Sequence, residues 1–474
     1  MSSLLLFVIA YMLLSIAIGV YAARKVKTAA DYAVAGRSLS MPVVIATTFA
    51  TWFGAETVLG VSATFAKDGL KGVVEDPFGS SMCLVLVGLF FAAKLYRMNL
   101  MTIGDYYRKR YGQAVEMITS VLIVLSYMGW VAAQIKALGL VFSLLAPELI
   151  SMQAGMVLGT AIVLAYTLYG GMFSVAITDF VQMIVIGVGL IFIAVLAANA
   201  AGGAGVVIQA AASKDLLTFL PKPEAKDMLA FFAAAITLML GSIPQQDVFQ
   251  RVMSSKNETI ATRGPIIGGL LYLVFAFIPM FMVIAALKLT PDVSEGLLEK
   301  DAQQILPTFV MTQMPLIAQV LFFGALLSAI MSTASATVLA PSTTIVENVL
   351  KPLLQSRGGL SDRATLRALR ITVLLFAAAV LVFALNTSDS IYEMVKNAYK
   401  ITLVGAFVPL VMGLYWKRAS NAGALCSIVL GISTWLVFEW QLAELFPAQL
   451  AGLIAAFVGM IGASLLVPQT VKSI

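Results

Sequence analysis

The stretches TWFGAET (51–57) and GSIPQQD (241–247) interrupt two long apolar runs of this sequence with glycine, proline and charged residues. Such residues are unfavourable in an uninterrupted helix that faces lipid. Broken backbone at membrane depth is tolerated only where it lines protein or a watery cavity. Broken helices in corresponding halves of a chain are typical of a central binding site. We therefore expect a binding site between the two breaks.

The composition around these breaks indicates a protein that lies in lipid. The chain has 474 residues, of which 60% are hydrophobic and 11% charged, too little polar surface to coat soluble domains of that size. Apolar runs of about 20 residues recur along the sequence, each long enough to cross a bilayer as a helix. We predict an all-α membrane protein with about 13 transmembrane helices. The predicted spans are 3–22, 41–65, 73–94, 115–146, 150–169, 173–197, 228–250, 264–288, 314–346, 367–386, 391–415, 421–441 and 447–468.

The spacing of the breaks predicts an internal symmetry. They fall in the second and the seventh predicted spans, and an odd offset of spans gives them opposite directions through the membrane. Spans two to six and seven to eleven are therefore expected to form two inverted repeats. The predicted parts are an N-terminal extra helix and cytoplasmic loop (1–40), the first repeat (41–197), an external loop (198–227), the second repeat (228–415) and two C-terminal extra helices (416–474).

The charged loops predict how the chain sits in the membrane. Basic clusters such as Arg108-Lys109-Arg110 fall in cytoplasmic loops if the N-terminus is outside and the C-terminus cytoplasmic, as the positive-inside rule favours. The first apolar run follows only Met1-Ser2-Ser3, without the basic lead-in of a cleaved signal peptide, so we expect it to remain as an anchor. The net charge of +6 follows from these loops and does not indicate nucleic-acid binding.

The absence of one residue type and of one motif from the sequence narrows the possible functions. The chain has no histidine and no Walker loop. Histidine metal sites, a Ser-His-Asp triad and ATP-driven pumping are therefore disfavoured, and we expect no enzymatic activity.

Hydroxyl side chains mark the ninth span as a candidate ion site. Spacings of three and four place Ser328, Ser332 and Ser335 on one helical stripe. Hydroxyls and freed carbonyls are hard oxygen ligands that suit a small cation. The alternative is that these residues only let helices pack closely and bond to their own turn.

Charged and aromatic side chains inside spans are further candidates. Glu56 lies within the first break, where an unpaired charge is costly, so it should face a cavity, a partner or a proton. Asp179 either serves a site or caps a cytoplasmic helix start. Lys396 either contacts solute or reaches the outer surface. Trp52 and Trp130 either line a cavity or anchor the interface.

Several segments resemble one known family. These are RKVKTAADYAVAGR (24–37), the pattern LYGG…TD…Q (168–182), FQR (249–251) and the hydroxyls of the ninth span. Together they resemble the solute:sodium symporter family over nearly the whole chain. The resemblance implies the leucine-transporter fold, with five plus five inverted helices, and sodium as the coupling ion.

The resemblance also implies site residues. A sodium ion would be held by carbonyls and hydroxyls of Ala50, Phe53, Ala329, Ser332 and Thr333. Some members bind a second sodium, which here would use Asp179, Ser332 and Ser335, although Ala336 stands where a further hydroxyl would be.

Two branches of the family suggest where the solute binds. The run LMLGSIPQ (238–245) is similar to the choline-transporter branch, whose members surround a quaternary ammonium with aromatic faces. Trp52 and Trp130 match such positions, whereas Ser80 and Gln245 stand where aromatic residues would be expected. Similarity to the sugar-transporting branch places Thr57 and Lys396 beside the solute, next to Glu56.

We therefore expect a sodium-coupled symporter that imports a small charged or zwitterionic organic solute, amino-acid-like or another polar metabolite, by alternating access. Its partners would be the solute and the lipid bilayer, with no nucleic acid and no obligate protein partner. A multi-pass protein of a cell membrane, namely a bacterial inner membrane, is expected from the resemblance. The alternatives are a proton-coupled carrier that uses Glu56 or Asp76, and a sensor that binds solute without moving it.

Overall fold

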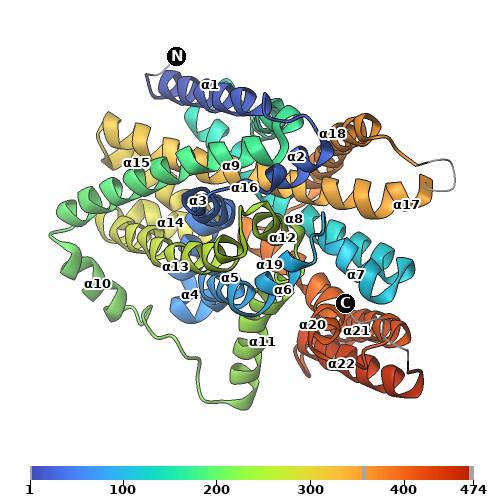
Figure 1. Cartoon of the computed structure of the whole chain (residues 1–474). Coiled ribbons are helices and arrows are strands. Elements are labelled where there is room, and N and C mark those ends of the chain that lie inside the picture. The colour runs from blue at the N-terminus through green and yellow to red at the C-terminus, as the bar shows by residue number, and fades with distance from the viewer. Residues whose placement is uncertain (1–2, 355–358, 469–474) are drawn as a thin grey trace.

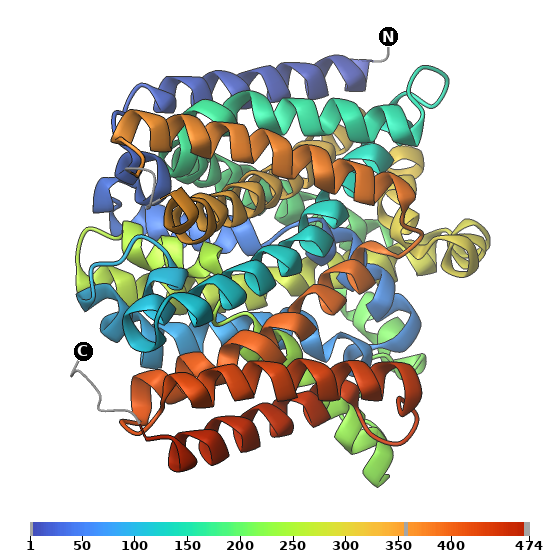
Figure 2. The same ribbon diagram turned by 90° about the vertical axis from the view of Figure 1, so that its right-hand side faces the viewer.

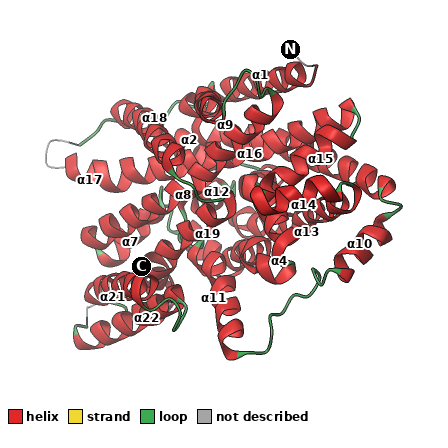
Figure 3. Cartoon of the chain, turned by 180° about the vertical axis from the view of Figure 1, so that it is seen from behind, coloured by secondary structure: helices red, strands yellow, loops and turns green. Residues whose placement is uncertain are grey.

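A computed structural model describes residues 3–354 and 359–468 of the chain, and all of its regular structure is helical (Figures 1 and 3). The α-helices are α1 (Ser3–Ala23), α2 (Ala29–Val34), α3 (Met41–Trp52), α4 (Ser62–Asp68), α5 (Ser80–Leu86), α6 (Ala92–Arg97), α7 (Ile103–Tyr111), α8 (Gln113–Leu145), α9 (Met152–Ala200), α10 (Ala204–Ser213), α11 (Ala225–Gly241), α12 (Gln246–Ser254), α13 (Glu258–Leu289), α14 (Pro291–Lys300), α15 (Ile305–Gln313), α16 (Leu316–Thr344), α17 (Lys351–Leu354), α18 (Asp362–Asn386), α19 (Ile391–Thr402), α20 (Val408–Tyr415), α21 (Asn421–Gln441) and α22 (Ala448–Leu466). Shorter 3₁₀ or π segments are η1 (Ala35–Arg37), η2 (Glu56–Val61), η3 (Leu70–Val73), η4 (Val74–Gly79), η5 (Val87–Phe91), η6 (Ala302–Gln304), η7 (Ile345–Leu350) and η9 (Leu403–Phe407).

The number of membrane spans is close to the prediction but not equal to it. Among the described residues, ten helices are long and apolar enough to cross a membrane, or up to twelve if each of two bent pairs is one span. The difference from 13 lies in α9, a 49-residue element that covers the predicted fifth and sixth spans as two helices that meet at a kink. Its backbone leaves helical geometry only at Gly171, with φ 49° and ψ −141°. A count of 13 requires the segments on either side of Gly171 to be separate spans.

The two bent pairs fall at the predicted breaks. Met41–Trp52 and Glu56–Asp68 meet at 52°, and Ala225–Gly241 and Gln246–Ser254 meet at 44°. The second break contains Pro244, which has no N–H to donate and disfavours helical geometry in the residue before it. Both breaks therefore leave backbone groups without helical partners in the middle of the protein.

The helices are stacked from one edge of the molecule to the other. Figure 2 shows the long helices running side by side across the view, with α1 at one edge and the packed pair α21 and α22 at the opposite edge. The hydroxyl-bearing half of α16, from Phe322 to Thr344, is buried. It packs against α9, α8 and α3, so α16 lies at the centre of the bundle.

Glycines let α13 approach the first broken helix closely. A Cβ on Gly268 would lie 2.9 Å from Thr48 Cβ, and one on Gly264 would lie 2.5 Å from Val44 Cγ1. Small residues at such contacts permit close helix packing in membranes, where there is no hydrophobic drive between helices. The α3 helix is therefore held by α13 on one side and by α9 and α16 on others.

Candidate functional site

The first break exposes the end of α3 to the hydroxyls of α16. The α3 helix ends at Trp52, and Phe53 leaves helical geometry with φ −88° and ψ 71°. The hydroxyl of Thr333 donates to the freed carbonyl of Thr51 at 2.7 Å. The break and the ninth-span hydroxyls, separated by about 280 residues, therefore meet as predicted.

The five residues predicted to hold sodium all lie at this junction. Ala50 and Phe53 belong to the end of α3 and its cap, whereas Ala329, Ser332 and Thr333 belong to α16, and all five are buried. The atoms available there to bind an ion are carbonyl and hydroxyl oxygens, which suit a hard monovalent cation. The set fits a sodium ion in chemistry and burial, and its role as a ligand set stays a proposal.

Asp179 joins the same junction from α9. Its Oδ1 accepts from Ser332 at 2.6 Å, and its Oδ2 accepts from Thr47 at 2.5 Å and Thr51 at 3.4 Å. The guanidinium of Arg251 lies 3.9 Å away. Because Asp179 is inside a continuous helical segment and bonds side chains of other helices, the helix-cap interpretation is wrong.

Ser335, unlike Ser332, makes no hydrogen bond to Asp179 among the described residues. Its hydroxyl donates to the Ser332 carbonyl of its own helix at 3.0 Å, which is the close-packing alternative for the stripe. Ser328 likewise donates to Gly324 O at 2.6 Å and also bonds Tyr11. Of the residues proposed for a second sodium, Asp179 and Ser332 are thus brought together.

An aromatic cluster lies between the two breaks. The ring centroids of Trp52 and Trp130 are 5.6 Å apart, and Tyr399 of α19 lies 5.6 Å from Trp130 and 6.4 Å from Trp52. Tyr127 stacks on Trp130 at 6.1 Å. All four rings are buried, so neither tryptophan is an interfacial anchor. We call Trp52, Trp130, Tyr399 and Tyr127 the aromatic cluster.

Two buried carboxylates border the aromatic cluster. Glu56 accepts from Trp130 Nε1 at 2.9 Å and from Gln134 Nε2 at 2.6 Å. Asp247, in the second break, accepts from Trp52 Nε1 at 3.1 Å and from Tyr127 Oη at 2.5 Å. Each break therefore presents one carboxylate that is held by the edge of a tryptophan of the cluster.

Thr57 and Ser80 lie around a third carboxylate, Asp76. Tyr272 of α13 donates to Asp76 and bonds Thr57 Oγ1 at 3.0 Å. Ser80 also bonds Asp76. Thr57 and Ser80 are therefore near Glu56 but are engaged within the protein.

Gln245 ties the second break to two other helices. Its Nε2 donates to Ser126 at 2.8 Å and to Thr402 at 3.4 Å. Its Oε1 is buried and has no hydrogen-bond partner among the described residues, and the same holds for the hydroxyl of Tyr399.

Lys396 lies farther out than the other predicted solute residues. It is 32% exposed and pairs with Glu75 at 3.8 Å and Glu393 at 3.7 Å. It lines a narrow crevice with Glu56 and Asp76, and the described residues of that lining include no member of the aromatic cluster. Its position favours the outer end of a path to the site over direct solute contact.

Several residues that contribute to this site were not among the predicted site residues. Asp247 lies in the quoted second stretch, but nothing in the sequence pairs it with Trp52. Tyr399 and Tyr127 sit on apolar spans without a local signal. Arg251 was noted only as part of a motif, whereas its side chain donates to Thr47 O at 3.1 Å and Asp247 O at 2.7 Å and also to Thr51 Oγ1. It thereby links both breaks.

A helical bundle with two broken helices and a polar centre between them defines the class of secondary transporters. Residues 32–431 match the model of the sodium:solute symporter family, and this chain belongs to that family. It is therefore a membrane transporter that couples solute movement to sodium, and not an enzyme.

Curated relatives agree with this assignment. The chain is 28% identical over 443 residues to the high affinity choline transporter 1 of Homo sapiens, covering 90% of this chain and 75% of that protein. It is 25% identical to the high-affinity proline transporter PutP of Bacillus subtilis, covering 93% and 94%.

Solved structures confirm the fold. A sodium-coupled sialic acid symporter in a substrate-bound outward-open state is similar with a TM-score of 0.87 and 20% identity over 100% of both chains. The nucleobase-cation symporter Mhp1 gives a TM-score of 0.60 at 15% identity, covering 93% of this chain and 96% of that one. The expected leucine-transporter fold is thus shown, while the residue limits of the repeats and the orientation of the termini stay predictions.

Proposed function

We propose that this protein imports a small organic solute with a positively charged group, an organic cation or an amino-acid-like zwitterion, together with sodium. The positive group would lie against the aromatic cluster, between Glu56 and Asp247. The observation that carries this proposal is the pairing of each cluster tryptophan with a buried carboxylate, one at each break.

Charge balance supports a cationic solute. Within the described part of the chain, the region of the breaks holds five carboxylates that are at most 3% exposed, namely Glu56, Glu75, Asp76, Asp179 and Asp247, and of these Glu75 pairs with Lys396 at 3.8 Å. The buried cation among them is Arg251, at 1% exposed. Uncompensated charges are costly in so apolar a place, and sodium can offset only part of the excess. A positive group on the solute would offset more of it.

The aromatic faces support the same conclusion. Tryptophan attracts a cation over its ring face by about 0.5–2 kcal/mol, most strongly where water is excluded. The Nε1–H groups of Trp52 and Trp130 are committed to Asp247 and Glu56, which fixes the ring planes. The faces of these rings are therefore positioned before solute arrives.

Two unpartnered polar atoms favour a second polar group on the solute. The Oε1 of Gln245 and the hydroxyl of Tyr399 belong to linked segments, because Thr402 accepts from Gln245 and donates to Tyr399 O at 3.2 Å. A buried polar atom without a partner costs about 1–3 kcal/mol, so a hydroxyl or carboxyl of the solute would satisfy these atoms.

A screen for stabilising solutes tests the proposal. Purified protein would be melted with quaternary amines, amino alcohols, amino acids, sugar acids and neutral sugars, each in sodium and in potassium at one pH. We expect stabilisation by members of the first three groups, and only in sodium. Stabilisation by sugar acids alone would contradict the cationic site, and stabilisation that follows pH but ignores sodium would indicate the proton-coupled alternative. Uptake of the stabilising solute into proteoliposomes then separates a carrier from a sensor.

A further inference from the structure

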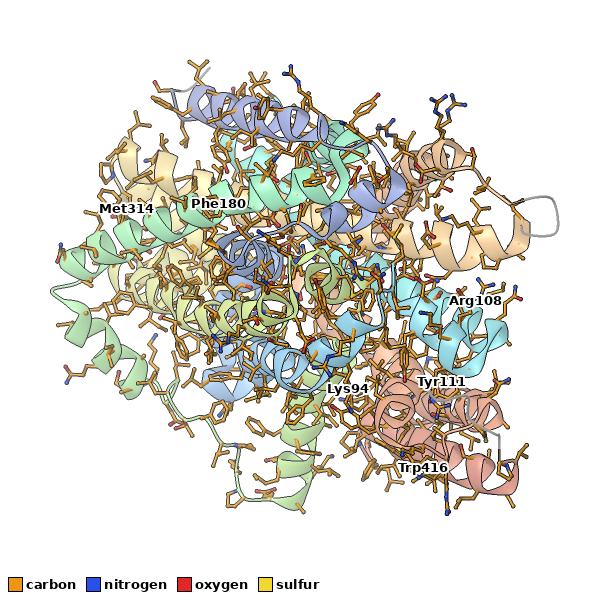
Figure 4. All side chains as sticks on the ribbon, viewed as in Figure 1. Lys94, Arg108, Tyr111, Phe180, Met314 and Trp416 are labelled. Atoms are coloured by element: carbon orange, nitrogen blue, oxygen red, sulfur yellow. The ribbon has the colours of Figure 1, made fainter. Side chains whose placement is uncertain are left out.

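A cavity of about 780 Å³ lies away from the transport site, where α6 and α7 meet the end of α20. Figure 4 shows Lys94, Tyr111 and Trp416 in this region, beside the C-terminal helices. The cavity has a basic and aromatic lining, and the described residues that form it include no carboxylate. The basic residues that line it are Lys94, Arg97, Lys109, Arg110 and Lys417.

Within residues 3–354 and 359–468, most of this positive charge has no carboxylate partner. Arg97 is paired with Glu258, 2.6 Å away. Arg110, in contrast, donates to the carbonyls of Gly413 at 3.0 Å and of Trp416 at 3.4 Å. Lys109 donates to the carbonyl of Met98 at 3.3 Å. These carbonyl contacts fix the cations without neutralising them, so the cavity favours an anion.

The walls of the cavity are built into the fold. Arg110 is 8% exposed, and its contacts satisfy carbonyls at the end of α20. Tyr106 and Tyr111 of α7 also donate to carbonyls of α20, at 3.2 Å and 2.7 Å. The positive charges are therefore held on a fixed junction between α7 and α20.

The position of the cavity relates it to the membrane surface. It lies at the ends of two candidate spans, Leu70–Arg97 and Ile391–Tyr415. The loops there are cytoplasmic in the orientation predicted from basic residues. Exposed Tyr415 and half-buried Trp416 are typical of side chains at the level of lipid headgroups.

An apolar strip adjoins the basic cavity. Leu89 is 60% exposed and Phe90 52% exposed, and Phe90 lies one helical turn before Lys94 on the same span. Tyr415 donates to Phe90 O at 2.5 Å, while Lys94 Nζ lies 3.4 Å from the centroid of the Tyr415 ring. A soluble anion would make no use of this strip, whereas the acyl chains of a lipid would lie along it.

We propose that this cavity binds the phosphate headgroup of an anionic phospholipid from the cytoplasmic leaflet. Basic pockets between transmembrane helices on this side of a membrane suit such headgroups, and each nearby lysine or arginine strengthens the attraction. Lys94 and Lys417, which are exposed at its mouth, contact the phosphate, and the acyl chains follow Leu89 and Phe90.

The test uses the full-length protein in detergent, titrated with phosphatidylglycerol, with phosphatidylcholine, or with inorganic phosphate, and followed by melting temperature. The variant K94Q/K417Q removes two cavity charges without touching the structural contacts of Arg110. The control K25Q/K27Q removes two exposed lysines from a predicted cytoplasmic loop that does not line the cavity, so its charge change is the same.

We expect phosphatidylglycerol to stabilise the wild type and the control at the same lipid concentrations, with phosphatidylcholine ineffective. Binding of phosphatidylglycerol to K94Q/K417Q should be weaker by roughly 30-fold. Equal binding by the two variants would overturn the site in favour of diffuse surface charge. Equal stabilisation by inorganic phosphate would overturn the lipid assignment in favour of a soluble anion.

Discussion

Removing the hydroxyls of Ser332 and Thr333 together should weaken sodium binding selectively. In the proposed ion site these are the two side-chain ligands, while Ala50, Phe53 and Ala329 contribute carbonyls. The double variant S332A/T333A keeps the backbone ligands and the helix. It therefore tests the ion site without removing the break that forms it.

The expected loss of sodium affinity follows from the contacts that the two hydroxyls would make with the ion. Hydrogen bonds that involve charged groups contribute about 1.5–3 kcal/mol, and water can replace part of a lost oxygen ligand. We take the loss of each hydroxyl to weaken the free energy of sodium binding by about 1 kcal/mol, which gives about 2 kcal/mol for the double variant. The sodium concentration for half-saturation should then rise by roughly 30-fold. The carboxylate of Asp179 keeps Thr47 and Thr51 as donors, at 2.5 and 3.4 Å, so it does not become an unpartnered buried charge.

The assay is the melting temperature of purified protein against sodium, with potassium replacing sodium at constant ionic strength. Ligand binding stabilises the folded state by RT ln(1 + [L]/Kd), so a fit of the rise in melting temperature with sodium gives Kd separately from intrinsic stability. We call the sodium concentration equal to Kd, at which the stabilisation is RT ln 2, the sodium midpoint. The control is T337A/S342A, which removes two buried hydroxyls of the same helix that donate to Thr333 O and Val338 O of their own turns, both at 2.7 Å. A wild-type sodium midpoint in S332A/T333A, or the same loss in the control, would refute the assigned ion site.

Three further changes test the solute site and the packing. W130F keeps an aromatic ring but removes the donor to Glu56, whereas W130L also removes the aromatic face. W130F should therefore weaken binding of the stabilising cation less than W130L. In a solute titration, W130L should lose up to about 2 kcal/mol more of the binding free energy than W130F. D247N should weaken the same cation by about 1–3 kcal/mol while leaving the sodium midpoint near wild type, and an unchanged solute affinity would place the cation elsewhere. G268A should lower the free energy of unfolding by about 1–3 kcal/mol, because its Cβ would meet Thr48 at 2.9 Å; an unchanged melting curve would show that α13 can shift at no cost.

The breaks could be predicted from sequence because their signals are local. Glycine, proline and charge inside an apolar run are visible in a few residues, and in the second break Pro244 lies among polar residues. The combination is the signal, because Pro279 and Pro341 lie inside the helices α13 and α16. The boundary between the predicted fifth and sixth spans is also local. Gly170 and Gly171 predict an interruption there, and Gly171 leaves helical geometry with φ 49° and ψ −141°, so α9 consists of two helices that meet at a kink.

The aromatic cluster could be predicted only in part, because its contacts join distant segments. Trp52 and Trp130 could be predicted as aromatic residues inside spans that match positions of the choline-transporter branch. Tyr399, however, lies 347 positions after Trp52, on a helix whose spacing says nothing about that contact. The role of Asp247 depends equally on where Trp52 and Tyr127 are placed in three dimensions.

The hydroxyl stripe shows why spacing alone does not assign ligands. Ser328, Ser332 and Ser335 share one face of α16, as predicted. Ser332 bonds Asp179 of another helix, whereas Ser335 bonds the carbonyl of its own preceding turn. A serine in a membrane helix has both options, and only the neighbouring helix decides between them.

The proposed ion site and the proposed solute site share consecutive residues of one chain segment, which gives a physical basis for their coupling. Thr51 bonds Asp179 through its hydroxyl and Thr333 through its carbonyl, on the ion side. The next residue, Trp52, bonds Asp247 and faces the aromatic cluster. A sodium ion that orders the carbonyls at this break would also order the Trp52 ring. Sodium binding would then cover part of the conformational-entropy cost of ordering the solute site, and the solute would bind more tightly. By linkage, the solute must strengthen sodium binding by the same factor.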